Sequence, residues 1–480
     1  MSVARTHKPH TFHENLIISV QPKSSTEKVK HMPKVSFIGM GYVGLCTAVC
    51  FANKGFKTII STNDPQKIEM INKGKPPFYE PKLEALLKKV IKNQNLRAVV
   101  GRKEAILETN ISFITVGTPS NPDGSVNLKF VEETSKEIGK ALKKKRDSHL
   151  VIVKSTVPPD TTEKLVKTNI EKQSGKICGK QFLLCFNPEF LREGNAIYDT
   201  LNPDYIVIGG YNKKSTETLE TLYKEFHKEN PPPIIKTNIP TAELIKYANN
   251  AFLATKISFI NTLANICEKI PGIDVKKIAE AIGKDHRINP HFLNAGLGWG
   301  GSCFPKDVKA LISFSKKIGY SPTLVEAMWK ANEDQIKFTI QKVKKELKTL
   351  KGKTIAILGL SFKPDTDDIR EARSTKIINQ LLREGAKITA YDPMAMPNIK
   401  KVFKEKIKYA SSPTKCLKNA DCAILITEWN EFKKLKPEDF TQNMRKSILI
   451  DSRRLYNPQE FSKKLRYIAI GLGEPSKPQP

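Results

Sequence analysis

The chain has 480 residues, of which 39% are hydrophobic, and it carries a formal net charge of +31. This length predicts two or three domains. No run of roughly 20 uninterrupted apolar residues occurs, which predicts that no segment spans a membrane. Residues 1–32 are polar and lack the apolar core of a secretory signal, so we expect a flexible basic tail and a cytoplasmic protein.

The excess of lysine and arginine raises nucleic acid as a possible partner, because basic residues neutralise phosphates. The basic residues, however, are spread along the chain in short runs such as Lys143-Lys144-Lys145, without the interleaved aromatics of a single-strand groove. We therefore expect no nucleic-acid partner, and we assign most of the charge to solvated helix faces. The eight cysteines show neither C-x-x-C nor zinc-finger spacing, which predicts no structural metal and no disulfide framework.

Residues 33–236 alternate between strand-like and helix-like patterns. A short apolar strand at residues 34–38 is followed by the turn Gly39-Met40-Gly41-Tyr42-Val43-Gly44, a helical run and a second strand at residues 58–61. Further strand-like runs lie at residues 111–116, 150–153, 182–185 and 205–208. This alternation predicts a parallel sheet that is covered by helices on both faces.

The pattern changes to helices alone between residues 237 and 350. About 30 residues from Thr241 contain neither proline nor glycine and place apolar side chains on nearly every face. Such a helix is buried between domains or subunits, which predicts a homodimer or a higher homo-oligomer. A second alternating series at residues 351–470 has strand-like runs at 353–358, 388–391, 422–426 and 447–450, and residues 471–480 are expected to form a tail. The predicted fold is α/β, with two Rossmann-like doubly wound parallel-sheet domains joined by a central all-helical region.

The turn from Gly39 to Gly44 has the spacing of a dinucleotide site. The first glycine makes the tight turn, the second lets a pyrophosphate approach the backbone, and the third lets helix and strand pack closely. An acidic residue is expected at the tip of the second strand, but Thr62 stands there, and Asp64 follows on the same side if the strand continues. We favour NAD, and the hydroxyl of Thr62 leaves NADP open.

A second motif contains the cysteine with the most reactive surroundings, and it reads Gly298-Trp299-Gly300-Gly301-Ser302-Cys303-Phe304-Pro305-Lys306-Asp307. Pro305 suits the first turn of a helix, so Cys303 stands at a helix N-terminus with Lys306 nearby. Both features favour a thiolate, which predicts a lowered pKa and a nucleophile. The alternative is an ordinary buried cysteine, but the flanking glycines leave room for a ligand.

Lys246 and Asn250 lie four residues apart in the long helix and therefore share one face. A buried lysine needs a partner or a ligand, and an anion or developing oxyanion between these two side chains is the functional interpretation. The alternative is a lysine at the helix edge whose ammonium group reaches solvent.

Seven motifs in this order resemble the UDP-glucose/GDP-mannose dehydrogenase family, in particular its UDP-glucose 6-dehydrogenases, over about residues 33–470. They are Gly39–Leu45, Thr118-Pro119, Lys154-Ser155-Thr156-Val157-Pro158, Asn187-Pro188-Glu189-Phe190-Leu191-Arg192-Glu193-Gly194, residues 243–250, residues 300–307, and Phe362-Lys363-Pro364-Asp365 with Asp368-Ile369-Arg370-Glu371.

The resemblance implies a four-electron oxidation of UDP-glucose to UDP-glucuronate with NAD. The aldehyde formed first is captured by Cys303 as a thiohemiacetal, oxidised again to a thioester, and hydrolysed. The implied catalytic residues are Cys303, Lys246, Asn250, Asp307, Glu189 and Thr156. The implied cofactor contacts are Gly39, Gly41, Tyr42, Val43, Gly44, Thr62, Lys67, Thr118, Thr156, Glu193, Lys306 and Arg370. The implied substrate contacts are Glu189, Phe190, Leu191, Glu193, Lys246, Asn250, Arg287, Phe292, Leu293, Asn294, Ala295, Gly296, Gly300 and Lys363, with Arg287 reaching across a dimer interface and the C-terminal domain binding UDP.

Two alternatives remain at this stage. The first is the same chemistry on GDP-mannose or a UDP-N-acetylhexosamine. Ser302 argues against the UDP-N-acetylhexosamine dehydrogenases, which usually carry histidine at this position. Residues 286–290 look more like those of the UDP-glucose branch. A non-enzymatic nucleotide-binding scaffold is the other, and it would be indifferent to the loss of Cys303. Thr62 stands where the family usually has a ribose-binding Asp, and Asn294 stands where some members carry lysine.

Overall fold

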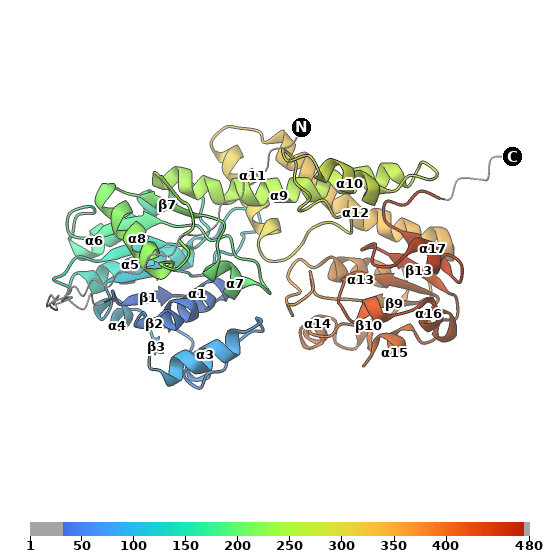
Figure 1. Cartoon of the computed structure of the whole chain (residues 1–480), viewed down its shortest axis with the longest axis horizontal. Helices are drawn as coiled ribbons and strands as arrows, with labels where there is room; N and C mark the ends of the chain where they lie inside the picture. The colour runs from blue at the N-terminus through green and yellow to red at the C-terminus, as the bar shows by residue number, and fades with distance from the viewer. Residues whose placement is uncertain (1–31, 475–480) are drawn as a thin grey trace, which may run out of the picture. The chain divides into compact units, whose positions relative to one another are not determined.

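The computed structural model describes residues 32–474 (Figure 1). The tail predicted over residues 1–32 lies outside this range apart from Met32, as do residues 475–480. Residues 471–474, which we predicted to belong to a C-terminal tail, instead contact the central helices: the N–H of Gly471 donates to Glu268 and that of Gly473 to the carbonyl of Ile273. The packed C-terminal domain therefore includes residues beyond the predicted boundary at residue 470.

The first domain is built on one eight-stranded sheet. Its strands, in spatial order, are β3 (Leu96–Val100), β2 (Thr58–Thr62), β1 (Val35–Ile38), β4 (Ile111–Ile114), β5 (Leu150–Val153), β6 (Leu183–Phe186), β7 (Ile206–Gly210) and β8 (Ile234–Thr237). The strands from β1 to β6 are parallel, as predicted, but β7 pairs antiparallel to β6 and parallel to β8. The predicted parallel sheet is therefore reversed at one end.

Helices cover both faces of this sheet. They are α1 (Tyr42–Asn53), α2 (Pro65–Asn72), α3 (Leu83–Lys92), α4 (Lys103–Leu107), α5 (Lys129–Leu142), the π-helix η1 (Thr162–Lys167), α6 (Thr168–Ser174), α7 (Ala196–Leu201) and α8 (Lys213–Phe226). Because successive strand residues point to opposite faces, Phe37 packs in one core with Phe51 of α1, whereas Ile38 packs in a second core with Ile138 of α5. Burial on both faces explains why these strands are apolar throughout.

The central region consists of α9 (Ile239–Cys267), α10 (Val275–Gly283), α11 (Phe304–Lys317) and α12 (Thr323–Leu347). Helix α9 begins two residues before the predicted Thr241, because the side chain of Asn238 caps it and Pro240 occupies its first turn. Helices α9 and α12 pack against each other (Figure 1). Across residues 32–474, every helix is too short or too polar to cross a membrane.

The second sheet is parallel throughout. Its strands, in spatial order, are β11 (Lys408–Tyr409), β10 (Lys387–Tyr391), β9 (Thr354–Leu358), β12 (Cys422–Leu425), β13 (Ile448–Asp451) and β14 (Arg466–Ala469). The accompanying helices are α13 (Arg373–Arg383), α14 (Met396–Phe403), η2 (Lys404–Lys406), α15 (Pro413–Leu417), η3 (Phe432–Lys434), α16 (Pro437–Asn443) and α17 (Pro458–Phe461). Two α/β domains with a helical region between them confirm the predicted fold class.

In the first sheet, the motifs singled out in the sequence follow the carboxyl ends of strands. Gly39 follows β1, Thr118 lies shortly after β4, Lys154 follows β5 and Asn187 follows β6. Carboxyl ends of parallel strands meet at one edge of a sheet, and the strand order changes direction between β1 and β4. This is where doubly wound sheets bind their ligands.

Candidate active site

Each glycine of the first turn has the backbone environment that its expected role requires. Gly39 has a φ of +118°, and a Cβ there would lie 2.5 Å from the carbonyl oxygen of Thr115. A Cβ on Gly44 would lie 2.0 Å from the oxygen of Gly39, so only glycine lets α1 start this close to the turn. A Cβ on Gly41 meets nothing within 4 Å, which leaves the backbone open to a pyrophosphate group at the start of α1.

A cavity of about 840 Å³ extends from this turn to Cys303. Eleven of the twelve expected cofactor residues line it, namely Gly39, Gly41, Tyr42, Val43, Thr62, Lys67, Thr118, Thr156, Glu193, Lys306 and Arg370. The twelfth, Gly44, acts through the packing of α1 rather than through the cavity wall. The cavity falls within the size range of small-molecule sites, and its residues fit a dinucleotide.

At the end of β2, the position of Asp64 differs from the one expected from the sequence. The strand stops at Thr62, and Asp64 is the N-cap of α2, where its carboxylate accepts hydrogen bonds from the N–H groups of Gln66 and Lys67. Asp64 therefore does not continue the strand on the same side as Thr62, because its carboxylate is needed to cap the helix. Thr62 lines the cavity at this strand tip, together with Ser61, Asn63 and Lys67.

A second cavity, of about 780 Å³, lies on the other side of Cys303. The expected substrate residues that line it are Glu189, Phe190, Leu191, Lys246, Asn250 and Phe292. Asn202, Asp204 and Tyr205, which precede the reversed strand β7, also line it. Cys303, Lys154 and Glu189 line both cavities, so the thiol stands where the two spaces meet.

Other expected substrate residues line neither of these two cavities, except for Glu193, which lines the first. Leu293 has its side chain in the hydrophobic core, and the N–H of Gly296 donates to Asn261 at 2.7 Å. Arg287 is exposed and its guanidinium lies 2.6 Å from the carboxylate of Asp285. The expected substrate residues that line neither cavity are Arg287, Leu293, Asn294, Ala295, Gly296, Gly300 and Lys363.

Cys303 is the N-cap residue of α11, as expected, but its thiol is not activated in the way predicted. Burial, together with the nearby carboxylates of Glu189 and Asp307, raises its pKa to about 11. Lys306, expected to favour the thiolate, forms an ion pair with Asp307 instead. The prediction of a lowered thiol pKa is wrong for this state of the protein, because two carboxylates and desolvation outweigh the helix N-terminus. The other seven cysteines are buried, in agreement with the expected core role.

Lys246 is buried with 3% of its side chain exposed, which excludes a lysine that reaches solvent at a helix edge. Its ammonium nitrogen lies 3.1 Å from Oε1 of Glu189. Burial is the largest effect and opposes the charged form, but Glu189, Cys303 and Asp307 together outweigh it and leave the pKa of Lys246 above its ordinary value. Asn250 donates from Nδ2 to Oδ2 of Asp307 at 2.7 Å. The helix face thus presents an ammonium and an amide beside the sulfur.

Lys154 is a site residue that belongs to one of the sequence motifs but for which the sequence predicted no role. Its ammonium donates to Oδ1 of Asn187 at 2.8 Å, and the Tyr223 hydroxyl donates to the same oxygen at 2.6 Å. Burial lowers the pKa of Lys154 to about 8. Its position directly after the buried strand β5 is the signal that could have identified it.

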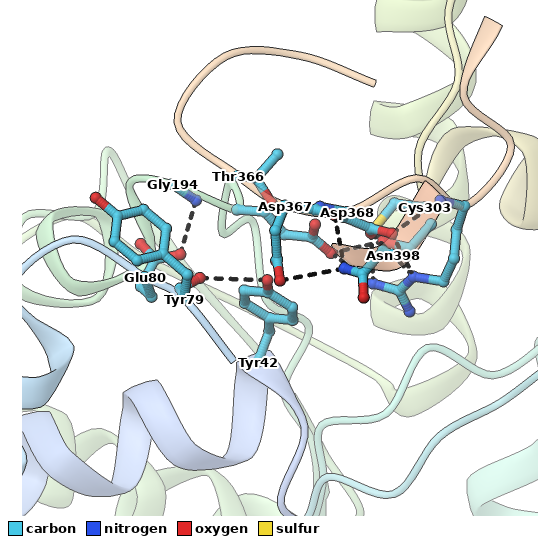
Figure 2. A network of polar contacts seen from close by, with 12 residues as sticks. Tyr42, Tyr79, Glu80, Gly194, Cys303, Thr366, Asp367, Asp368 and Asn398 are labelled. Atoms are coloured by element: carbon cyan, nitrogen blue, oxygen red, sulfur yellow. Dashed lines mark hydrogen bonds and ion pairs between the residues drawn. The ribbon is translucent and has the colours of Figure 1, made fainter. Parts of the chain in front are cut away.

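Glu80 anchors the chain next to the first cavity (Figure 2). Its buried carboxylate accepts hydrogen bonds from the N–H groups of Gly194 at 2.7 Å and Ala196 at 2.8 Å. The Tyr42 hydroxyl donates to the carbonyl of Tyr79 at 3.3 Å, which ties the glycine turn to the same segment. These contacts hold the backbone immediately after Glu193 in place.

Three family models match the chain in order. Residues 33–227 match the NAD binding domain of the UDP-glucose/GDP-mannose dehydrogenase family, residues 240–334 its central domain, and residues 356–458 its UDP binding domain. The first match confirms the predicted NAD cofactor, and the third agrees with a UDP-sugar ligand.

Individual proteins are similar over almost the whole length. A UDP-glucose 6-dehydrogenase of Haloferax volcanii is 43% identical over 428 residues, which cover 89% of this chain and 98% of that protein. The structure of a UDP-glucose dehydrogenase from Pyrobaculum islandicum is 35% identical, with a TM-score of 0.86, over 94% of this chain and 100% of that one. A UDP-D-ManNAc dehydrogenase from Pyrococcus horikoshii is 27% identical, with a TM-score of 0.81, over 91% and 99%.

Proposed function

Because the chain belongs to the UDP-glucose/GDP-mannose dehydrogenase family, we propose that Cys303 is the covalent nucleophile in an NAD-dependent oxidation of UDP-glucose to UDP-glucuronate. The observation that carries the proposal is the position of the thiol at the junction of two cavities. One cavity has the residues of a dinucleotide site, and the other has an ammonium, an amide and aromatic side chains that suit a sugar.

NAD, when bound in the first cavity, supplies the acceptor for the two hydrides that the sugar carbon loses. The protein's own side chains account for the remaining steps. Cys303 adds to the aldehyde carbon, so a C–S bond forms, the thiol proton leaves and the carbonyl oxygen becomes an oxyanion. We assign Lys246 and Asn250 as the donors to that oxyanion, because both line the sugar cavity together with Cys303.

Hydrolysis of the thioester needs an oriented water molecule. Asp307 is 2% exposed and Glu189 is 7% exposed, and both carboxylates lie close enough to raise the pKa of the Cys303 thiol. Thr156 lines the same wall after β5. We assign these three side chains to positioning that water, which attacks the acyl carbon and releases the thiol.

UDP-glucose is the substrate we favour over other nucleotide sugars. The similar proteins named UDP-glucose dehydrogenases share 35–43% identity with this chain, whereas the UDP-D-ManNAc dehydrogenase shares 27%. The serine at position 302 agrees with the UDP-glucose branch.

A cofactor-reduction assay tests this assignment. We expect UDP-glucose to yield two NADH per sugar, because the thiohemiacetal is oxidised before it leaves the enzyme. GDP-mannose and UDP-N-acetylglucosamine serve as comparison substrates, and NADP as the comparison cofactor. A yield of one NADH with free aldehyde, or faster turnover of GDP-mannose, would contradict the proposal.

We also propose that the protein acts in the cytoplasm as a homodimer or a higher homo-oligomer. Helix α9 exposes Leu244, Phe252, Phe259 and Ile266, and their spacing places them along one side of the helix. An exposed apolar stripe of this kind marks an interaction surface.

Phe259 is the best position at which to test the oligomer, because it is 52% exposed and does not line the sugar cavity. We expect Phe259→Glu to shift the protein to a monomer in sedimentation velocity, because a carboxylate at this position resists burial. Lys269→Glu, beyond the end of the same helix, is the charge control. An unchanged sedimentation coefficient for Phe259→Glu would place the interface elsewhere.

A further inference from the structure

We propose that Ser302 and Glu193 form a proton relay that removes the thiol proton of Cys303 as its sulfur attacks the substrate. This inference rests on the proposed function, since it concerns the activation of the same nucleophile. It gives Ser302 a catalytic contact with the reacting sulfur, and it makes Glu193 the proton acceptor that acts through Ser302.

The three side chains form a continuous path. The Ser302 hydroxyl donates to Oε1 of Glu193 at 2.7 Å, and its oxygen lies 3.6 Å from the sulfur of Cys303. Since the hydroxyl hydrogen is directed to the carboxylate, the hydroxyl oxygen is free to accept the thiol hydrogen. Figure 2 shows Cys303 at one end of the polar network that contains Asp368.

The surroundings of the thiol make a base necessary. Burial, Glu189 and Asp307 oppose a thiolate more strongly than Lys246 and the Ser302 hydroxyl favour it. The cationic groups are themselves paired, Lys246 with Glu189, and Arg370 with Asp368 and Glu193. A half-buried thiol that stays protonated is a weak nucleophile. A base connected through one hydroxyl removes the proton only as the C–S bond forms.

Glu193 has the properties of such a base. Only 11% of its side chain is exposed, and its second oxygen, Oε2, is buried with no hydrogen-bond partner in the described part of the chain. Burial raises its pKa to about 7, and the negative charge of Asp368 contributes to the shift while Arg370 opposes it. Charged or titratable groups farther along the same wall are Lys363, Glu80 and Tyr42.

The transfer balances in protons and electrons. The thiol proton moves to the oxygen of Ser302, the hydroxyl proton of Ser302 moves to Glu193, and the electron pair of the S–H bond forms the new C–S bond. The electron pair of the carbonyl π bond moves to oxygen, next to Lys246 and Asn250. One proton therefore ends on Glu193, and no oxidant or reductant takes part in this step.

Alkylation of Cys303 by iodoacetamide tests the relay in the full-length protein without any nucleotide, so its result does not depend on which sugar is the substrate. The other seven cysteines are buried, and peptide mass spectrometry identifies the modified thiol. The variants are Ser302→Ala, Ser302→Thr and Glu193→Gln. Ser315→Ala, a loss of hydroxyl farther along α11, is the matched control.

We expect the wild-type alkylation rate to rise with pH through an inflection near 7, where Glu193 loses its proton. Ser302→Ala and Glu193→Gln should lose this inflection and react about 10²-fold more slowly above it, in line with the loss of general-base assistance. Ser302→Thr should restore the wild-type profile, because it keeps the hydroxyl. Ser315→Ala should behave as wild type.

A faster rather than slower alkylation of Cys303 in the Glu193→Gln variant would overturn the relay. If Glu193 is only a negative charge near the sulfur, its replacement by glutamine removes a repulsion and speeds alkylation. A Ser302→Ala profile with the wild-type inflection would also overturn the relay. A retained relay in a protein that does not oxidise UDP-glucose would contradict the proposed function alone.

Discussion

Replacement of Cys303 by serine is expected to lower the turnover of UDP-glucose by at least about 10⁴-fold, since loss of a covalent nucleophile has effects of this order. A serine hydroxyl is a poorer nucleophile toward the aldehyde, and an oxygen ester would be hydrolysed less readily than a thioester. NAD binding should be unchanged, because the glycine turn and the strand tip at Thr62 lie at the far end of the first cavity from the sulfur.

The comparison needs two measurements and one control. NADH formation reports turnover, and titration calorimetry with NAD reports cofactor binding. Cys178→Ser changes a thiol that lines neither cavity and should retain turnover. Turnover of Cys303→Ser near the wild-type rate would rule out the covalent mechanism and revive the binding-scaffold alternative.

Lys246→Met should lower kcat by about 10²- to 10³-fold, the usual result of removing one donor to an oxyanion. It should also destabilise the protein by about 3–5 kcal/mol, because the variant leaves the charge of Glu189 buried without its partner. NADH formation and urea denaturation measure the two effects separately.

The double variant Lys246→Met, Glu189→Gln distinguishes catalysis from stability. It removes both buried charges, so we expect most of the free energy of unfolding to return while kcat stays low. Recovery of kcat together with stability would show that Lys246 has only a structural role.

The Lys246–Glu189 pair also has a defined dependence on pH. The pKa of Glu189 is lowered by Lys246 despite the opposing effect of burial, and that of Lys246 is raised. A lowered carboxyl pKa contributes stability that is present above the unfolded-state value and lost as the pH falls through the folded-state value. A raised lysine pKa contributes stability that is lost as the pH rises through its folded-state value. The stabilisation therefore lies between these two titrations.

Local patterns were enough to predict the parts of the fold that depend on local chemistry. The glycine turn, the start of α9 close to Thr241 and the position of Cys303 at the start of α11 all follow from short-range steric and hydrogen-bonding rules. Strand β8 was not predicted, because it follows three prolines and its residues are half-buried or exposed, so no apolar pattern marks it.

The state of the thiol could not be predicted in the same way. The pKa of Cys303 depends on Glu189, which is 114 residues away in the sequence and reaches the sulfur only through the fold. Lys306 pairs with Asp307, its neighbour in the sequence, and the motif contained both residues without indicating that they form an ion pair. The helix position and the neighbouring Lys306 predict a lowered pKa of the Cys303 thiol, and burial reverses the direction of this shift.

The reversal of β7 has a consequence for how this domain accommodates two ligands. Phe186 of β6 pairs with Gly209, so the amino end of β7 extends past the carboxyl end of β6. A parallel strand would have directed its amino end, with residues 202–205, to the opposite rim. Because β7 is inverted, residues 202–205 lie at the nucleotide-binding edge of the sheet, where they line the second cavity. The wall that faces the hexose therefore comes from a change of chain direction rather than from an added loop.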